Sequence, residues 1–131
     1  MSMSDDEFLE SLRQDFVTES QDLLENAESH LLDMEKDKNP QHLIEVNRSL
    51  HSLKGSARAV GYTDYADLVH NLESNISSSA LKQRDMTAFM STSLRCIDML
   101  RQLTEFHANK DSSGVTSQIA AVRELLTIYA K

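Results

Sequence analysis

The residue with the clearest chemical potential is His51, which is followed by Lys54, Gly55 and Ser56. In a helix, positions three and four residues further on share a face with His51, within roughly 5–6 Å by Cβ. A neutral imidazole can attack an electrophile with its unprotonated nitrogen while the other nitrogen keeps the proton. A lysine nearby can offset negative charge on the ring, and a glycine leaves space for a large molecule. The spacing is typical of a histidine that accepts a phosphoryl group and passes it on.

The helix that must carry His51 is indicated by apolar residues at steps of three and four, the period of one helix face. These residues are Leu43, Val46, Leu50, Leu53, Ala57 and Val60. His51 directly follows Leu50, so its ring is expected at the flank of this stripe rather than in the core. We predict a helix from Pro40 to Val60, with Asn39 as its N-cap and Gly61 as its C-terminal cap.

The next helix supplies two further site residues, His70 and Glu73, which share one side because they are three residues apart. The turn at Gly61 is short, so this helix should run antiparallel to the one that carries His51. His51 lies ten residues before Gly61 and Glu73 twelve after it, which brings both to a similar height at ~1.5 Å per residue. Glu73 can then accept the proton of one ring nitrogen and leave the other as nucleophile. The competing interpretation is that Glu73 is a solvated carboxylate.

Basic residues outnumber acidic ones on the predicted His51 helix. It carries Arg48, Lys54 and Arg58 but only one carboxylate, Glu45. Such a stripe could attract an acidic partner surface or the phosphates of ATP. A salt-bridged helix face explains Arg48 and Arg58 equally well, and Lys54 could be a plain solvated lysine. The expected partner-binding residues are Arg48, Gly55, Ser56 and Arg58.

The run from His51 to Ser56, with Gly61 after it, resembles the motif of the histidine phosphotransfer (HPt) family. The likeness extends from about Phe8 to the C-terminus and is closest to the N-terminal phosphotransfer domain of the chemotaxis histidine kinase CheA. Ser56 departs from the glycine that is more usual there in CheA and matches many free-standing phosphotransfer proteins instead.

The resemblance implies that residues matching His70 and Glu73 form a hydrogen-bonded network with the phosphoacceptor and the lysine. It implies a donor, the ATP-binding domain of a CheA-like kinase in the same or another polypeptide. It also implies receivers, an aspartate on response regulators resembling CheY or CheB. The chain would then be no enzyme by itself. The alternative from another class is a helical protein–protein interaction module in which His51 is inert.

The composition restricts the other function classes. A formal net charge of −8 and a pI near 5.0 argue against a general nucleic-acid binder. The single cysteine, Cys96, rules out an internal disulfide and is expected as a small core or boundary residue. Neither a signal peptide nor a membrane-spanning run is visible, so we expect a cytoplasmic, monomeric domain without membrane insertion.

We expect neither a cofactor nor a metal site. Helical bundles build di-iron sites from Glu-x-x-His, and none of the five histidines has a glutamate three residues before it. Only Asp67-x-x-His70 comes near. A nucleotide site is also unsupported, because the sequence has no Gly-rich phosphate loop.

One proline, three glycines and no tryptophan favour an all-α fold. We predict an antiparallel up-down four-helix bundle with an additional C-terminal helix, as one domain over residues 1–131. The first helix should run from about Asp6 to Lys36, capped by Asp5 after a loose tail at 1–5. Its inward face is predicted as Leu9, Leu12, Phe16, Leu23, Ala27, Leu31 and Met34, with Ser20 in the one gap.

The second half of the chain predicts three helices separated by polar loops. Thr63 or Asp64 should cap the third helix, which should end in the serine-rich segment 77–83. Asp85 should cap the fourth helix. Residues 110–114 are predicted as a loop and 115–130 as the fifth helix.

Overall fold

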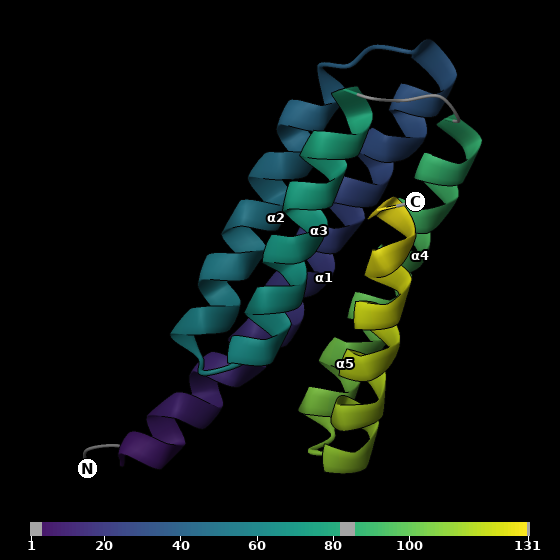
Figure 1. Ribbon diagram of the computed structural model, residues 1–131. Helices are drawn as coiled ribbons and strands as arrows, with labels where there is room; N and C mark the ends of the chain where they lie inside the picture. Colours follow the sequence, from purple (N-terminus) through teal and green to yellow (C-terminus); the bar gives the residue numbers. More distant parts are fainter. Residues whose placement is uncertain (1–3, 82–85, 131) are drawn as a thin grey trace.

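The structure is a computed structural model that describes residues 4–81 and 86–130. Within these ranges the chain is helical throughout and forms no strand, which confirms the predicted all-α class. Figure 1 shows long helices lying side by side, with the first turns of α1 extending past the turn that joins α2 and α3. The elements are α1 Asp5–Asp37, α2 His42–Ala59, α3 Thr63–Leu81, α4 Met86–Ala108, α5 Ser112–Leu126 and the short 3-10 helix η1 Thr127–Ala130.

The helices share one hydrophobic core. Helix α1 packs against α2 and α4, α3 packs against α2, and α5 covers α4 and α3. The apolar stripe predicted for the helix that carries His51 is buried, except for Leu43, which is partly buried at the edge. Apolar residues of α3 and α4 also line the core. Cys96 is buried as predicted, and burial raises the pKa of its thiol to about 12, so it stays protonated.

The inward face of α1 differs from the prediction by one position. Leu24 is fully buried, whereas the predicted Leu23 is only partly buried against the core. Ser20 occupies the gap as expected, fully buried, and its hydroxyl donates to the carbonyl of Val17 at 2.8 Å. Because Leu24 follows Ser20 by four residues, the buried stripe keeps the helical period through the polar gap.

The start of α1 corrects the predicted cap and the last two residues of the predicted tail; residues 1–3 of that tail lie outside the described residues. The N-cap is Ser4, whose hydroxyl accepts a hydrogen bond from the backbone N–H of Glu7 at 3.2 Å. Asp5 is the first helical residue instead, where its negative charge interacts favourably with the positive end of the helix dipole. A serine hydroxyl and an aspartate are both good caps, so the sequence could not rank the two neighbours.

The turn between α2 and α3 confirms the role predicted for Gly61. This glycine has φ +85°, and its N–H donates to the carbonyl of Arg58 at 3.1 Å. The N–H of Tyr62 donates to the carbonyl of Ala57 at 2.9 Å, which completes a Schellman motif. The turn therefore brings the start of α3 directly onto the end of α2.

The start of α2 and the end of α3 also differ from the predictions. Helix α2 starts at His42 rather than Pro40, because the side chain of Asn39 accepts from the N–H of Gln41 in the preceding turn. Helix α3 continues through the serines to Leu81, since serine costs little in a helix; the predicted cap Asp85 lies outside the described residues.

The fifth helix also begins earlier than predicted. Helix α5 starts at Ser112 instead of residue 115, because the carboxylate of Asp111 caps it by accepting from the N–H of Gly114 at 2.9 Å. The predicted α-helix also ends early, at Leu126, and the following residues form η1. None of the helices in the described ranges has the length and apolar character needed to cross a membrane.

Candidate functional site

His51 lies in the middle of α2, on the side where α3 packs. Its side chain is 73% exposed, while its neighbours Leu50 and Leu53 are fully buried. The helix is thus anchored by its apolar stripe, and the imidazole stands at the flank of that stripe as predicted. The Nδ1 atom faces α3, at 3.8 Å from Oε2 of Glu73. The ring's other nitrogen, Nε2, is then the one available to an incoming group.

Glu73 lies between the histidine and a lysine and uses a different oxygen for each. Its Oε1 pairs with Nζ of Lys54 at 3.2 Å, and its Oε2 is the oxygen nearest to His51. The side chains of Glu73 and Lys54 are only 18% and 11% exposed. The interpretations of Glu73 as a solvated carboxylate and of Lys54 as a plain solvated lysine therefore do not fit the geometry.

His70 completes the cluster at its solvent side. Its Nδ1 lies 3.5 Å from Nζ of Lys54 and 4.0 Å from Oε1 of Glu73, and its side chain is 58% exposed. An ammonium group can only donate, so His70 accepts from Lys54 through an unprotonated Nδ1. The structure thus brings together all four residues predicted to take part in the chemistry, two from α2 and two from α3.

The separation between His51 and Glu73 exceeds a direct hydrogen bond, which needs about 2.7–3.2 Å for N–H···O. An exposed imidazole can close the remaining gap of about 1 Å by rotating about its side-chain bonds, or one water can bridge the two groups. Hydrogen bonds of catalytic groups are often long before the substrate binds and shorten in the complex. The arrangement can hold the Nδ1 proton and leave Nε2 unprotonated.

Gly55 lies one turn beyond His51 on an open part of the helix surface. A Cβ atom built on Gly55 would meet nothing within 4 Å. Packing within this chain therefore does not require a glycine there. Ser56 beside it points the other way, and its hydroxyl donates to Oε1 of Glu19 on α1 at 2.7 Å. The observed contact of Ser56 thus ties α2 to α1.

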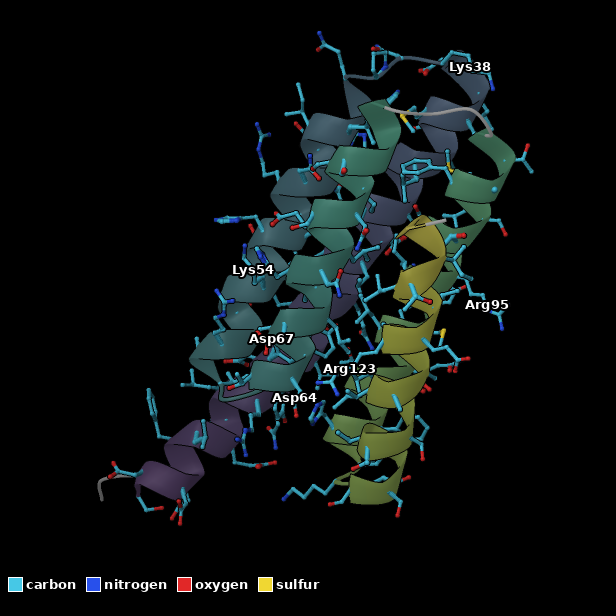
Figure 2. The ribbon with its side chains drawn as sticks, in the orientation of Figure 1. Lys38, Lys54, Asp64, Asp67, Arg95 and Arg123 are labelled. Carbon is cyan, nitrogen blue, oxygen red and sulfur yellow. The ribbon has the colours of Figure 1, made fainter. Side chains whose placement is uncertain are left out.

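The two arginines of the predicted basic stripe each lie near a carboxylate. Arg48 forms an ion pair with Glu45 at 2.7 Å, and Arg58 lies 4.0 Å from Asp67 on α3. Figure 2 labels Lys54 and Asp67 on these neighbouring helices. Counting charges along α2 alone overstated the positive field, because α3 supplies acidic partners to the same face. Both arginine side chains remain more than half exposed.

Two acidic residues that contact predicted partner-binding residues, Glu19 and Asp67, were not predicted. Each makes its contact across helices, so no local spacing in the sequence could indicate it. Glu19 lies 37 residues before its partner Ser56. A register argument like the one that placed Glu73 opposite His51 could have found Asp67. It follows Gly61 by six residues whereas Arg58 precedes Gly61 by three, an offset close to that of Glu73 and His51.

Comparison with known proteins shows the family to which this chain belongs. Residues 11–108 match the family of the Hpt domain. The chain belongs to the Hpt domain family. This Hpt domain is 29% identical over 125 residues to the chemotaxis protein CheA of Bacillus subtilis, with 83% of the chain and 19% of the relative covered.

Two further relatives of the Hpt domain come from other organisms. The chemotaxis protein CheA of Halobacterium salinarum is 30% identical over 125 residues, covering 92% of the chain and 18% of the relative. The gliding motility regulatory protein of Myxococcus xanthus is 28% identical over 121 residues, covering 92% of the chain and 15% of the relative. The Hpt domain thus spans less than a fifth of the length of these curated relatives. The resemblance predicted from the motif is confirmed, and it supports histidine phosphotransfer in two-component signalling.

Proposed function

We propose that His51 accepts a phosphoryl group from the ATP-binding domain of a histidine kinase and passes it to an aspartate on a response-regulator receiver domain. One observation carries the proposal. An exposed imidazole directs Nδ1 at a carboxylate, and that carboxylate is itself held by Lys54 through its other oxygen. A histidine that only covered the helix surface would need neither partner.

In the proposed first step, the lone pair of His51 Nε2 attacks the γ-phosphorus of ATP. The N–P bond forms as the bond to the bridging oxygen breaks, and ADP leaves. Glu73 accepts a hydrogen bond from Nδ1–H and stabilises the positive charge that develops on the ring. In the second step, a carboxylate oxygen of the receiver attacks the phosphorus, the N–P bond breaks and its electron pair returns to Nε2.

Lys54 and His70 are proposed to adjust the charge around this transfer. The ammonium of Lys54 offsets the buried charge of Glu73 and, after phosphorylation, part of the charge of the phosphoryl group. His70 accepts from Lys54 and restricts where that ammonium can point. In this scheme the chain supplies the nucleophile and its orientation, whereas ATP binding belongs to another module.

The partner surface is proposed to surround His51 on α2. Gly55 offers a bare stretch of backbone with open space above it. Arg48 and Arg58 lie toward either end of this surface with exposed side chains, and they can exchange their intramolecular carboxylates for those of a partner. Ser56 would contribute by fixing α2 against α1 rather than by contacting the partner.

The wider context is proposed from the relatives' names. The donor would be a CheA-like kinase, in the same polypeptide or another, and the receivers would resemble CheY or CheB. We propose that residues 1–131 act as one monomeric cytoplasmic domain, an antiparallel four-helix bundle with α5 added. The alternative of an inert helical interaction module is disfavoured by the paired charges beside His51, which a docking surface alone does not need.

The test is incorporation of acid-labile phosphate from ATP in the presence of a CheA-like kinase domain. The parent and His30→Gln, a matched change at a histidine outside the phosphotransfer cluster, should both be labelled, whereas His51→Gln should not. Equal labelling of His51→Gln and the parent would eliminate the proposal. Circular dichroism of the three proteins checks that each remains folded.

A further inference from the structure

We propose that His30, Asp33 and His42 form a binding site for a divalent transition-metal ion of the Zn²⁺ class. The site lies where the end of α1 meets the start of α2, apart from the phosphotransfer residues. His30 and Asp33 project from the last turns of α1, and His42 is the first residue of α2. One ligand atom from each residue lies within 4.8 Å of the others.

The spacing of the two imidazoles fits a shared metal ion. Nδ1 of His30 and Nδ1 of His42 lie 3.0 Å apart, and the ring centroids lie 5.3 Å apart. With Zn–N bonds of about 2.0–2.1 Å and tetrahedral angles, two ligating nitrogens lie about 3.3–3.4 Å apart. The rings need to separate by only a few tenths of an ångström to receive the ion. Both histidines are partly buried, which limits their alternative orientations.

A carboxylate already orients one of the ligands. Nε2 of His42 lies 2.9 Å from Oδ2 of Asp37, so Nε2–H donates to that carboxylate and Nδ1 keeps its lone pair. Metal-binding histidines almost always donate their other N–H to such an outer carboxylate or carbonyl. Without a metal, His30 must donate its own Nδ1 proton to His42. On metal binding that proton moves to Nε2 of His30, and both rings stay neutral.

The donor set selects the class of metal. Two imidazole nitrogens and one carboxylate oxygen suit Zn²⁺ and the neighbouring ions Co²⁺, Ni²⁺ and Cu²⁺, whereas Mg²⁺ and Ca²⁺ prefer oxygen ligands throughout. Asp33 is exposed, so a fourth position is open to water. The Glu-x-x-His spacing does not describe this group, because its ligands come from two helices joined by the turn at 38–41.

The site is separate from the proposed phosphoacceptor. His42 lies nine residues before His51, which corresponds to about 13 Å along α2. A bound ion would join the ends of α1 and α2 and stabilise this hairpin without contacting the phosphotransfer cluster. The metal proposal therefore stands or fails independently of the proposed function.

The direct test is titration of the full chain, without a histidine tag, with Zn²⁺ alone by isothermal calorimetry. We expect one equivalent to bind, and Co²⁺ to give the visible absorption of a tetrahedral complex. His30→Gln and His42→Gln should lose this binding. Asp37→Asn should weaken it by about 10- to 100-fold, as is usual for outer-shell partners.

Controls at the other exposed histidines exclude binding elsewhere. His51→Gln and His70→Gln should bind Zn²⁺ as the parent does. Zn²⁺ at one hundred times its Kd should raise the folded-to-unfolded ratio of the parent about 100-fold, but not that of His42→Gln. If a histidine variant does not fold, Asp33→Asn, at an exposed position, tests the site by weaker binding. Absence of binding to the parent, unchanged affinity in His42→Gln and Asp33→Asn, or loss in His51→Gln would each overturn the proposal.

Discussion

The replacement Gly55→Ala should make the chain more stable and a poorer phosphotransfer protein at once. Gly55 lies inside the 18-residue helix α2, and a Cβ atom there would meet nothing within 4 Å. An alanine in a helix interior is favoured over glycine by about 0.5–1 kcal/mol, because alanine loses less backbone conformational freedom on folding than glycine does. No clash opposes this gain. For a 131-residue domain it corresponds to a rise in Tm of about 2–4 °C.

The same methyl group would stand on the face that we propose for docking. Overfilling a close-packed contact costs about 1–3 kcal/mol, so transfer to a receiver domain should slow by about tenfold or more. Urea denaturation measures the stability, and the loss of labelled phosphate from the phosphorylated chain to a receiver measures the transfer.

Gly61→Ala is the matched control for the stability effect. Gly61 has φ +85°, a left-handed conformation that costs an alanine about 1–2 kcal/mol. It should therefore destabilise the chain, the opposite of Gly55→Ala. A destabilised Gly55→Ala protein would refute the description of this position as open. A stabilised one with unchanged transfer would refute the idea that the glycine serves a partner.

Three further predictions concern the site and the core. Glu73→Ala should leave the fold intact but slow phosphorylation by about tenfold or more, in a time course of phosphate incorporation; unchanged kinetics would mean that the carboxylate does not orient the nucleophile. His107 is half-buried and stacks on Tyr62 at 3.9 Å, and burial lowers its pKa, so native stability should be complete above pH ~6.5 and fall as the pH drops toward that lowered pKa. His107→Phe should remove this part of the pH dependence in urea denaturation at a series of pH values, and an unaltered profile would contradict the assignment. The hydroxyls of Tyr65 and Thr104 lie 3.0 Å apart in the core, and Thr104 also donates to a backbone carbonyl. Thr104→Val should therefore cost about 1–3 kcal/mol by leaving the tyrosine hydroxyl unpaired, more than the 0.5–1.5 kcal/mol or so expected for Tyr65→Phe; the reverse order in thermal unfolding would contradict it.

Periodicity and one short turn were enough to predict most of the fold and the meeting of the site residues. The apolar stripe around Leu50 and Leu53 determines which face of α2 is buried, and His51 lies at the flank of that stripe. The turn at Gly61 set the register between α2 and α3. Because that register depends only on counting residues along two rigid helices, it brought Glu73 opposite His51 without any tertiary information.

Contacts between helices that are not joined by a short turn could not be predicted in this way. Glu19 reaches Ser56 from α1, and His30 meets His42 across the α1–α2 junction. Helix ends were also misplaced by a few residues, since Ser4 and Asp111 compete with equally good neighbouring caps. The serine-rich composition before Leu81 favours a loop, but the low cost of serine in a helix lets α3 continue to Leu81.

The central claim is that Nε2 of His51 carries the phosphoryl group. Phosphorus–proton correlation NMR on the phosphorylated chain tests it most directly, because coupling through the N–P bond identifies the ring and the nitrogen. Since Nδ1 faces Glu73, the account predicts a single phosphohistidine at position 51, modified on Nε2. A phosphoryl group on Nδ1 of His51, or on His70 instead, would contradict it.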